Sequence, residues 1–184
     1  MKKKEHNNIA VFAGGCFWCT EAVFKRLKGV TNVTSGYTGG DVKNPAYREI
    51  CTGKTGHAEA VKLTYSSDDI AYEELLEVFF ATHNPTTLNR QGNDIGTQYR
   101  SAIFYTDESQ RRSALGFIDK LKKEKIFQRH IVTEVMPLTV FYEAEDVHQD
   151  YYDEHINQPY CQLVIQPKLK KLNEKYTHKL KNKI

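Results

Sequence analysis

The sequence predicts an α+β fold: a single domain in which a mixed β-sheet and packed helices form a two-layer sandwich, with a reactive cysteine at the N-terminus of a helix. The chain has 184 residues, which is the size of one domain. Segments with strand and helix patterns follow one another without strict alternation. No internal repeat, low-complexity linker or shift in composition marks a second domain.

The N-terminal part of the chain predicts two strands with a helix between them. Residues 8–13 form a short apolar run that two glycines end, so we expect a buried strand and then a turn. Residues 16–27 carry apolar side chains at helical spacing up to Gly29, which predicts a helix with Cys16 at or near its N-terminus. Residues 30–37 are rich in strand-favouring residues and predict the next strand.

The middle of the chain predicts a strand and a helix between two loops. Residues 44–55 contain proline and glycine and predict a loop. Residues 58–65 alternate apolar and charged side chains imperfectly and predict a strand, whereas residues 67–82 present an apolar face at helical spacing. Residues 83–96 are rich in Asn, Gly and Pro, which predicts a long loop, and such loops are often functional.

The C-terminal half predicts a further strand and helix, followed by shorter elements. Residues 99–105 predict a strand and residues 108–127 predict a helix. Residues 133–143 predict one or two short strands around Pro137. Residues 144–155 predict a short, polar helix.

The C-terminal end of the chain is rich in lysine. We place residues 167–184 as a lysine-rich segment outside a domain of residues 1–166, and we expect this segment to be amphipathic or frayed and solvated. It has no interleaved arginines and little aromatic content, and the formal net charge of the chain is only +3. We therefore expect neither a nucleic-acid partner nor a membrane partner.

Two observations bear on membrane targeting. No apolar run approaches the ~18 residues that a spanning helix needs. The basic start Met1–Lys4 looks like the first region of a signal peptide, but the apolar stretch of residues 9–13 is shorter than the ~7–15 residues that such a peptide requires. We therefore expect a cytoplasmic protein, and we expect it to be a monomer.

The chain contains four cysteines: Cys16, Cys19, Cys51 and Cys161. A reducing cytoplasm keeps such residues as thiols. We therefore expect them to be catalytic, metal-binding or inert, and not to form a structural disulfide framework.

The segment Gly14-Gly15-Cys16-Phe17-Trp18-Cys19 carries the most chemical information. The amides and the dipole at a helix N-terminus stabilise a thiolate, so we expect a lowered pKa for Cys16. Phe17 and Trp18 offer an apolar wall beside the sulfur. Cys19, three residues further on, offers a second sulfur that could form a disulfide after oxidation.

Other interpretations of this segment remain open. A zinc site needs two further ligands, for which Cys51 and His57 are available, but a second paired motif is absent and we expect no metal. Cys16 could also be a buried apolar cysteine, although its glycine and aromatic neighbours are atypical of core packing. A general thiol–disulfide oxidoreductase would be expected to carry a proline near the dithiol and a thioredoxin-like βαβ order, and neither is evident.

From residue 9 to about residue 161, the chain resembles the peptide methionine sulfoxide reductases of the A type. Segments 15–18, 35–40, 44–49, 55–60 and 91–101 carry the resemblance, and segment 144–149 is a weaker match. The five stretches read Gly15-Cys16-Phe17-Trp18, Ser35-Gly36-Tyr37-Thr38-Gly39-Gly40, Asn44-Pro45-Ala46-Tyr47-Arg48-Glu49, Thr55-Gly56-His57-Ala58-Glu59-Ala60 and Gln91-Gly92-Asn93-Asp94-Ile95-Gly96-Thr97-Gln98-Tyr99-Arg100-Ser101. Five motifs in the same order are together highly specific, and residues 1–166 would then be the reductase domain.

The resemblance implies a reaction without a cofactor that repairs oxidised proteins. The enzyme would reduce the S-epimer of methionine sulfoxide, free or in proteins, and the division of this chemistry by epimer is a general property of such reductases. Cys16 would attack the sulfoxide sulfur, Glu59 would protonate the oxygen, and Cys16 would remain as a sulfenic acid. A second cysteine would convert it to a disulfide, which thioredoxin would reduce.

The resemblance also implies roles for five residues around the substrate. Tyr47 and Tyr99 match hydroxyl donors to the sulfoxide oxygen, and Asp94 matches an acidic residue behind it. Phe17 and Trp18 match the residues that house the methyl group. Each has an ordinary alternative: the aromatic residues could be core packing, and Asp94 could be a turn residue.

Glu59 can donate a proton near neutral pH only if burial raises its pKa. The alternative is that Glu59 is an exposed strand residue, which is the usual fate of glutamate.

The identity of the second cysteine is open between Cys161 and Cys19. Many relatives carry it in a glycine-rich tail, whereas Cys161 is followed by Gln162-Leu163-Val164-Ile165. The polar stretch of residues 155–160 could place Cys161 on a loop over the active site, and because C-terminal loops reorder at low cost we favour Cys161. Cys51 matches a position that is not needed for turnover.

We predict that Cys16→Ser abolishes sulfoxide reduction even with excess dithiothreitol. A hydroxyl at this position is far less ionised and less nucleophilic than a thiolate. The methionine formed is measured against the wild-type protein. Near wild-type turnover would contradict the assignment of Cys16 as the nucleophile.

Overall fold

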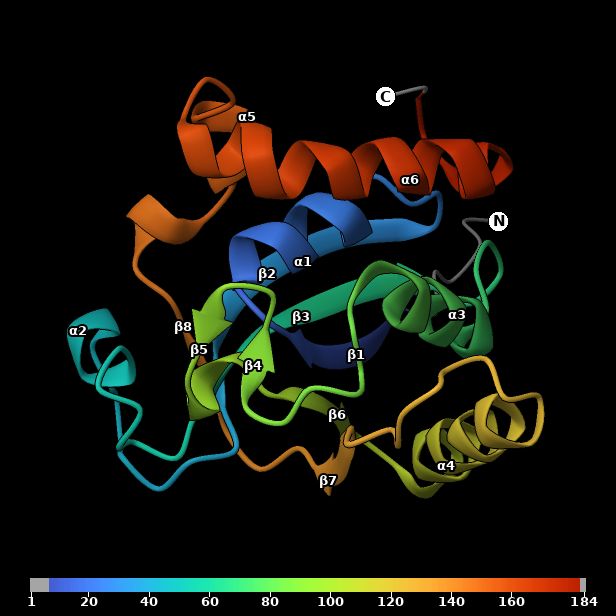
Figure 1. Ribbon diagram of the computed structural model, residues 1–184, viewed down its shortest axis with the longest axis horizontal. Helices are drawn as coiled ribbons and strands as arrows, with labels where there is room; N and C mark the ends of the chain where they lie inside the picture. Colours follow the sequence, from blue (N-terminus) through green and yellow to red (C-terminus); the bar gives the residue numbers. More distant parts are fainter. Residues whose placement is uncertain (1–6, 183–184) are drawn as a thin grey trace, which may run out of the picture.

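The computed structural model describes residues 7–182, and its central feature is a six-stranded β-sheet (Figure 1). The strand order is β7-β6-β1-β3-β2-β8. Neighbouring strands are antiparallel except β6 and β7, which are parallel, so the sheet is mixed. The predicted α+β class is therefore confirmed. The basic start Met1–Lys4 lies outside the described residues.

The elements follow the predicted order. The strands are β1 (Asn7–Gly14), β2 (Val30–Thr38), β3 (Ala58–Ser66), β6 (Ser101–Tyr105), β7 (Glu134–Pro137) and β8 (Phe141–Glu143), with β4 (Arg90–Gln91) and β5 (Asp94–Ile95) as a separate hairpin. The helices are α1 (Phe17–Phe24), α2 (Tyr47–Ile50), α3 (Tyr72–Thr82), α4 (Glu108–Lys123), α5 (Tyr151–Glu154) and α6 (Gln166–Tyr176). Single 3-10 turns cover Thr97–Tyr99, Asp146–His148 and Thr177–Lys179, and a π-helical turn, Cys161–Ile165, leads into α6.

The main hydrophobic core lies between the helices and one face of the sheet. Alternate residues of a strand point to opposite faces, so Phe12 of β1 faces the helices while its neighbours face away. The Phe12 ring lies 5.2 Å from Phe24 of α1 and 5.0 Å from Phe79 of α3, measured between ring centroids. These stacked rings fix α1 and α3 on the same face of the sheet.

A smaller core covers the opposite face of the sheet. Ala58 and Ala60 of β3 are fully buried there, in a cluster that Leu138 and Phe141 cover. Because Glu59 lies between these two alanines on the strand, its side chain points to the helical side. The alternation of β3 therefore places a carboxyl group under the helices.

Helix α1 is enclosed on several sides, because it lies between the sheet and α6 (Figure 1). Most of its side chains are buried, and the polar Glu21 is buried among them. The helix that was expected over residues 16–27 is shorter than predicted, because it ends at Phe24.

Helix α6 is amphipathic, and its apolar face completes the main core. Leu169 and Leu172 are buried, whereas most of the lysines around them are exposed. The amphipathic expectation for this part of the lysine-rich segment is confirmed, and the frayed alternative is wrong for residues 167–176. No helix in residues 7–182 is long and apolar enough to cross a membrane.

Several predicted loops contain short elements. Residues 44–55 include helix α2, and residues 83–96 include the β4–β5 hairpin. The single helix expected over residues 144–155 is wrong: a 3-10 turn and α5 are separated at Asp150, whose φ of 54° interrupts the helix. The two strands of residues 133–143 lie at opposite edges of the sheet, since β7 pairs with β6 and β8 pairs with β2.

Three element boundaries in the structure also differ from the predicted ones. Helix α3 begins at Tyr72, because the Ile70 amide donates to the Ser66 carbonyl and closes a turn before it. Helix α4 ends at Lys123, and Tyr99 lies in a 3-10 turn before strand β6.

We predict that Leu169→Ala lowers the free energy of unfolding by ~2–5 kcal/mol, because it leaves a cavity in the main core. Leu163→Ala is the matched control, since Leu163 is 77% exposed just before the same helix and its loss should change stability by less than about 0.5 kcal/mol. Urea unfolding measures both. Equal small effects would contradict the placement of α6 in the core.

Candidate active site

Cys16 lies at the N-terminus of α1, as predicted. It is the residue that precedes the first turn, and its carbonyl oxygen accepts the amides of Cys19 and Thr20 at 3.1 and 3.4 Å. Gly15 before it has a φ of 95°, and a Cβ atom there would lie 2.6 Å from the Gln91 side chain. Glycine at this position therefore allows the hairpin to close against the start of the helix.

The thiol of Cys16 is nearly buried, with 8% of the residue exposed. Burial, followed by the hydrogen bond with the Cys19 thiol and the charge of Glu59, raises the pKa of Cys16 well above its ordinary value of 9.0. The lowered pKa expected from the helix N-terminus is therefore wrong for the free protein. Desolvation of the thiol outweighs the stabilisation that the helix end offers its thiolate.

Cys19 is the thiol of this pair with the lowered pKa. Its hydrogen bond with Cys16 lowers the pKa of Cys19 to about 7, against the opposing effect of burial. The Tyr160 hydroxyl lies 3.7 Å from the Cys19 sulfur. The structure thus brings two thiols with different acidities into contact at the start of one helix.

Glu59 is buried beneath the same helix start. Its Oε2 atom accepts the Phe17 amide at 3.0 Å, and only 1% of the residue is exposed. Burial raises the pKa of Glu59 to about 8, although the hydrogen bond from Phe17 opposes this shift. Glu59 is therefore a neutral carboxylic acid at neutral pH, and not the exposed strand residue of the alternative interpretation.

Tyr47 and Tyr99 face the Glu59 carboxyl from two other elements. Tyr47 begins α2 and Tyr99 ends a 3-10 turn, and both side chains are half-buried. Burial, followed by the charge of Glu59, raises the pKa of both phenols. Both therefore remain hydroxyl donors at neutral pH.

Asp94 joins this polar group through a residue that sequence reasoning missed. Its Oδ2 atom accepts the Tyr160 hydroxyl at 2.8 Å, and the same hydroxyl contacts the sulfur of Cys19. Tyr160 thus connects the hairpin carboxylate to the thiol pair. The signal in the sequence that could have identified Tyr160 is its position immediately before Cys161.

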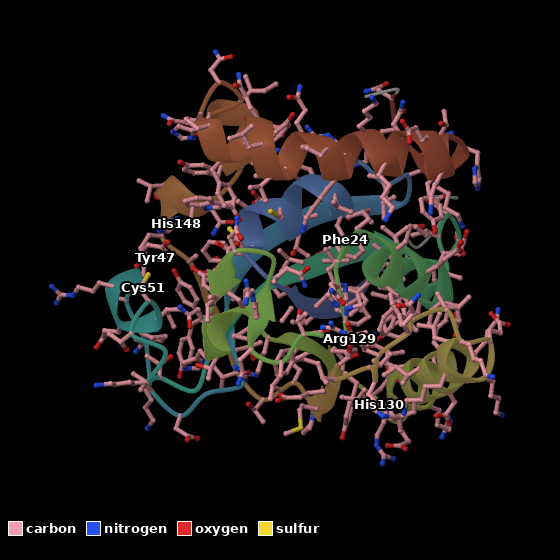
Figure 2. All side chains as sticks on the ribbon, in the orientation of Figure 1. Phe24, Tyr47, Cys51, Arg129, His130 and His148 are labelled. Carbon is pink, nitrogen blue, oxygen red and sulfur yellow. The ribbon has the colours of Figure 1, made fainter. Side chains whose placement is uncertain are left out.

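Phe17 and Trp18 form part of an aromatic wall beside Cys16. The Phe17 ring lies 5.7 Å from Tyr37 and 5.5 Å from His148, and the Trp18 ring stacks on Tyr151 with centroids 3.6 Å apart. Figure 2 shows Tyr47 and His148 at the same end of the molecule, and their rings lie 4.2 Å apart. The wall is therefore continuous from α1 to α2.

The segment of residues 145–151 supplies most of the contacts that the sequence did not reveal. Glu145 accepts the Tyr37 hydroxyl at 2.9 Å and the Tyr47 amide at 2.8 Å. His148 and Tyr151 contribute rings to the wall, and burial lowers the pKa of His148, which favours its neutral form. The weak motif at residues 144–149 was the only signal for this segment.

Buried Glu21 fixes this segment to α1. Its Oε1 atom accepts the Asp150 amide at 3.0 Å, and burial raises the pKa of Glu21 to about 7. Lys25 and Arg26 of the same helix region pair with Asp153 at 3.0 and 2.7 Å. The helix that carries the thiols therefore also holds the wall in place.

Cys161 lies in a helix and not on a loop, so that expectation is wrong. It is the first residue of the π-helical turn and is fully buried, and burial raises the pKa of its thiol. The buried Ile165 anchors the same turn. Movement of Cys161 towards Cys16 would require this turn to unwind.

Cys51 and His57 do not form the zinc site that was considered. Cys51 is exposed at the end of α2, where its side chain shares a hydrogen bond with Tyr47. Both ring nitrogens of His57 are used: the Gly40 amide donates to Nδ1 at 3.1 Å, so Nε2 donates to the Val42 carbonyl at 2.7 Å. Within residues 7–182, no group of three His, Cys, Asp or Glu side chains could hold a metal ion.

The assembled groups define a distinct chemical capacity. A cysteine nucleophile, a neutral carboxylic acid and two phenols lie close enough to shift one another's pKa values, and an aromatic wall lies beside them. Such a site can attack an electrophilic atom, protonate an oxygen that becomes basic, and take up the oxidising equivalents as a disulfide.

Comparisons with known proteins agree with this capacity. The family model for peptide methionine sulfoxide reductase matches residues 8–181. The chain is 56% identical to the peptide methionine sulfoxide reductase MsrA of Saccharolobus solfataricus, over 94% of this chain and 97% of that protein. The reduced form of Mxr1 from Saccharomyces cerevisiae superposes with a TM-score of 0.78 at 29% identity and covers 88% of this chain and 92% of its own. Mxr1 in complex with Trx2 gives a TM-score of 0.55 at 20% identity, covering 82% and 88% of the two chains.

We predict a specific pH dependence of stability from Glu59. Its pKa is raised from 4.5 to about 8 in the folded state, so the folded protein binds the proton more tightly than the unfolded chain. Stability relative to Glu59→Gln should therefore be greatest below pH 4.5, decline as the pH rises, and be level above about 8. Urea unfolding at a series of pH values measures this difference, and a rise between these limits would contradict a buried neutral Glu59.

Proposed function

Because the chain belongs to the peptide methionine sulfoxide reductase family, we propose that it reduces methionine S-sulfoxide, free or within proteins, at Cys16. The observation that carries this proposal is the neutral carboxylic acid of Glu59, hydrogen-bonded at 3.0 Å to the first turn of the helix that begins immediately after Cys16. A proton donor and a sulfur nucleophile are thereby fixed at one position, which is what reduction of a sulfoxide requires.

In the first step, Cys16 attacks the sulfoxide sulfur as its thiolate, which is the minor form of this thiol at neutral pH because its pKa is raised. The oxygen becomes strongly basic as the sulfur is attacked, and Glu59 gives it a proton. The oxygen then passes to Cys16 as a sulfenic acid, and methionine leaves with its sulfur reduced. The Cys16 sulfur is oxidised, because it loses the two electrons that the methionine sulfur gains.

The surrounding residues orient the substrate for this step. The hydroxyls of Tyr47 and Tyr99 hold the sulfoxide oxygen near Glu59, with Asp94 behind them. Phe17 and Trp18 receive the methyl group. Stacking of Trp18 on Tyr151 at 3.6 Å supports this role, because a ring fixed on one face is preorganised for contact on its other side.

In the second step, a neighbouring thiol converts the sulfenic acid to a disulfide and releases water. We propose Cys19 for this role in place of the favoured Cys161. Cys19 lies three residues from Cys16 at the start of the same helix, where each thiol shifts the pKa of the other, whereas Cys161 is fully buried in a helical turn. The low cost of movement that favoured Cys161 applied to a loop, and the turn removes that advantage.

Thioredoxin is the reductant that we propose for the resulting disulfide. The family resemblance supports this assignment, and yeast Mxr1 has been solved in complex with Trx2. Thiol–disulfide exchange supplies two electrons and two protons, so the cycle needs no cofactor. We further propose that the protein is a monomer in the cytoplasm, where thioredoxin keeps thiols reduced.

We predict that the enzyme consumes the S-sulfoxide and leaves the R-sulfoxide. The two epimers differ in the direction of the oxygen relative to the methyl group, and the proposed site binds each group separately: Glu59 protonates the oxygen, and the aromatic wall receives the methyl group. Each epimer is incubated with dithiothreitol and the methionine is quantified. Equal consumption of both epimers, or preferential reduction of protein disulfides, would contradict the proposed function.

We predict a Cys16–Cys19 disulfide after one equivalent of substrate without reductant. Peptide mass spectrometry locates the bond, and Cys51→Ser is the control because Cys51 lies on another element. Cys161→Ser should keep thioredoxin-dependent turnover. A Cys16–Cys161 bond in the wild-type protein would contradict the proposed order of steps and restore the original preference.

A further inference from the structure

A small cavity is lined by Cys19 and by a residue of the C-terminal helix α6. Its volume is about 10 Å³, and its wall includes Cys19 of α1, His83 after α3 and Lys168 of α6. Helices α1 and α6 are in direct contact here. Lys168 therefore lines the same cavity as one of the two thiols, because the lysine-rich helix packs on α1.

The charge of Lys168 reaches the Cys19 thiol. After the hydrogen bond from Cys16, which is the main cause, the ammonium of Lys168 contributes to lowering the pKa of Cys19. Lys168 is only half-buried and also borders a larger groove of about 640 Å³ beside Arg129 and Lys171. Its ammonium can thus remain hydrated while it acts on the buried sulfur.

Within residues 7–182, the other titratable groups that act on Cys19 do not supply a positive charge. Cys16, Glu59, Asp94, Tyr160 and Cys161 face it from the start of α1, from β3, from β5 and from the segment before α6.

His83 lines the same cavity, but burial lowers its pKa to about 4. Its Nδ1 atom donates to the Phe79 carbonyl at 2.6 Å, and its Nε2 atom accepts from Ser101 at 2.7 Å, so it is neutral. Of the described residues that line this cavity or act on Cys19, Lys168 is therefore the one that carries a positive charge.

We propose that Lys168 is a positioning residue for the second step, which stabilises Cys19 as the thiolate that attacks the sulfenic acid on Cys16. The proposal rests on the function assigned above. The Cys19 sulfur forms the S–S bond as the S–O bond of the sulfenic acid breaks. The hydroxide that leaves takes up one proton, which balances the proton that Cys19 released, and becomes water. Lys168 touches neither the substrate nor Cys16 in this step, and acts through Cys19 alone.

The test separates the two steps in the full-length enzyme. One equivalent of methionine S-sulfoxide is added without reductant, and the methionine and the Cys16–Cys19 disulfide are quantified over time after alkylation. The variants are Lys168→Met, Lys168→Arg and Lys171→Met. Lys171 is a control on the same helix, because it borders the larger groove but not the cavity beside Cys19.

We expect Lys168→Met to form methionine at the wild-type rate and the disulfide roughly three- to tenfold more slowly near neutral pH. The rate of exchange follows the thiolate fraction, which falls when the nearby positive charge is removed. The difference should vanish at high pH, where Cys19 ionises without help. Lys168→Arg should restore the rate, and Lys171→Met should match the wild-type protein.

A disulfide rate in Lys168→Met that equals the wild-type rate, or that is reduced equally at every pH, would overturn the role of Lys168. A Cys16–Cys161 bond in the wild-type enzyme would overturn it as well, while leaving sulfoxide reduction in place. Failure of the wild-type enzyme to form methionine from this substrate would instead overturn the proposed function itself.

Discussion

The buried hydrogen bond from the Phe17 amide to the Glu59 carboxyl joins strand β3 to the first turn of α1. Burying this carboxyl is costly in its charged form, and the fold meets that cost by keeping it protonated. The bond satisfies one of the amides that a helix N-terminus leaves without a partner. The same contact therefore sets the position of Cys16, stores a proton beside it, and fixes the sheet against the helix.

The rest of the site is built outwards from α1. Glu21 on its inner side holds the Asp150 amide, and this link sets where His148 and Tyr151 stand. Tyr160, at the entrance to the C-terminal helix, joins Asp94 to the thiol pair. Segments far apart in the sequence thus meet around one helix, and the C-terminal helix is part of that arrangement through the contact of its leucines with the core.

The sequence was most informative where a pattern had a single physical solution. Alternation in β3 and the two glycines before Cys16 predicted a strand, a turn and a helix start, and all three are present. The sequence could not show that the thiol at the N-terminus of α1 is buried away from water, so the pKa of Cys16 was predicted in the wrong direction. Nor could local patterns place Cys161, since a polar stretch with a proline is compatible with a loop, whereas burial of Ile165 fixes a helical turn.

The most direct test of the central claim is the pH dependence of methionine formation in a single turnover, for wild type and Glu59→Gln. The reactive form combines a Cys16 thiolate with a protonated Glu59, so the wild-type rate should rise with pH and stop rising near the Glu59 pKa of about 8. Glu59→Gln should be roughly 10²–10⁴-fold slower and should continue to rise through that pH, because only the thiol then titrates. Profiles of the same shape and similar rate would contradict the assignment of Glu59 as the proton donor.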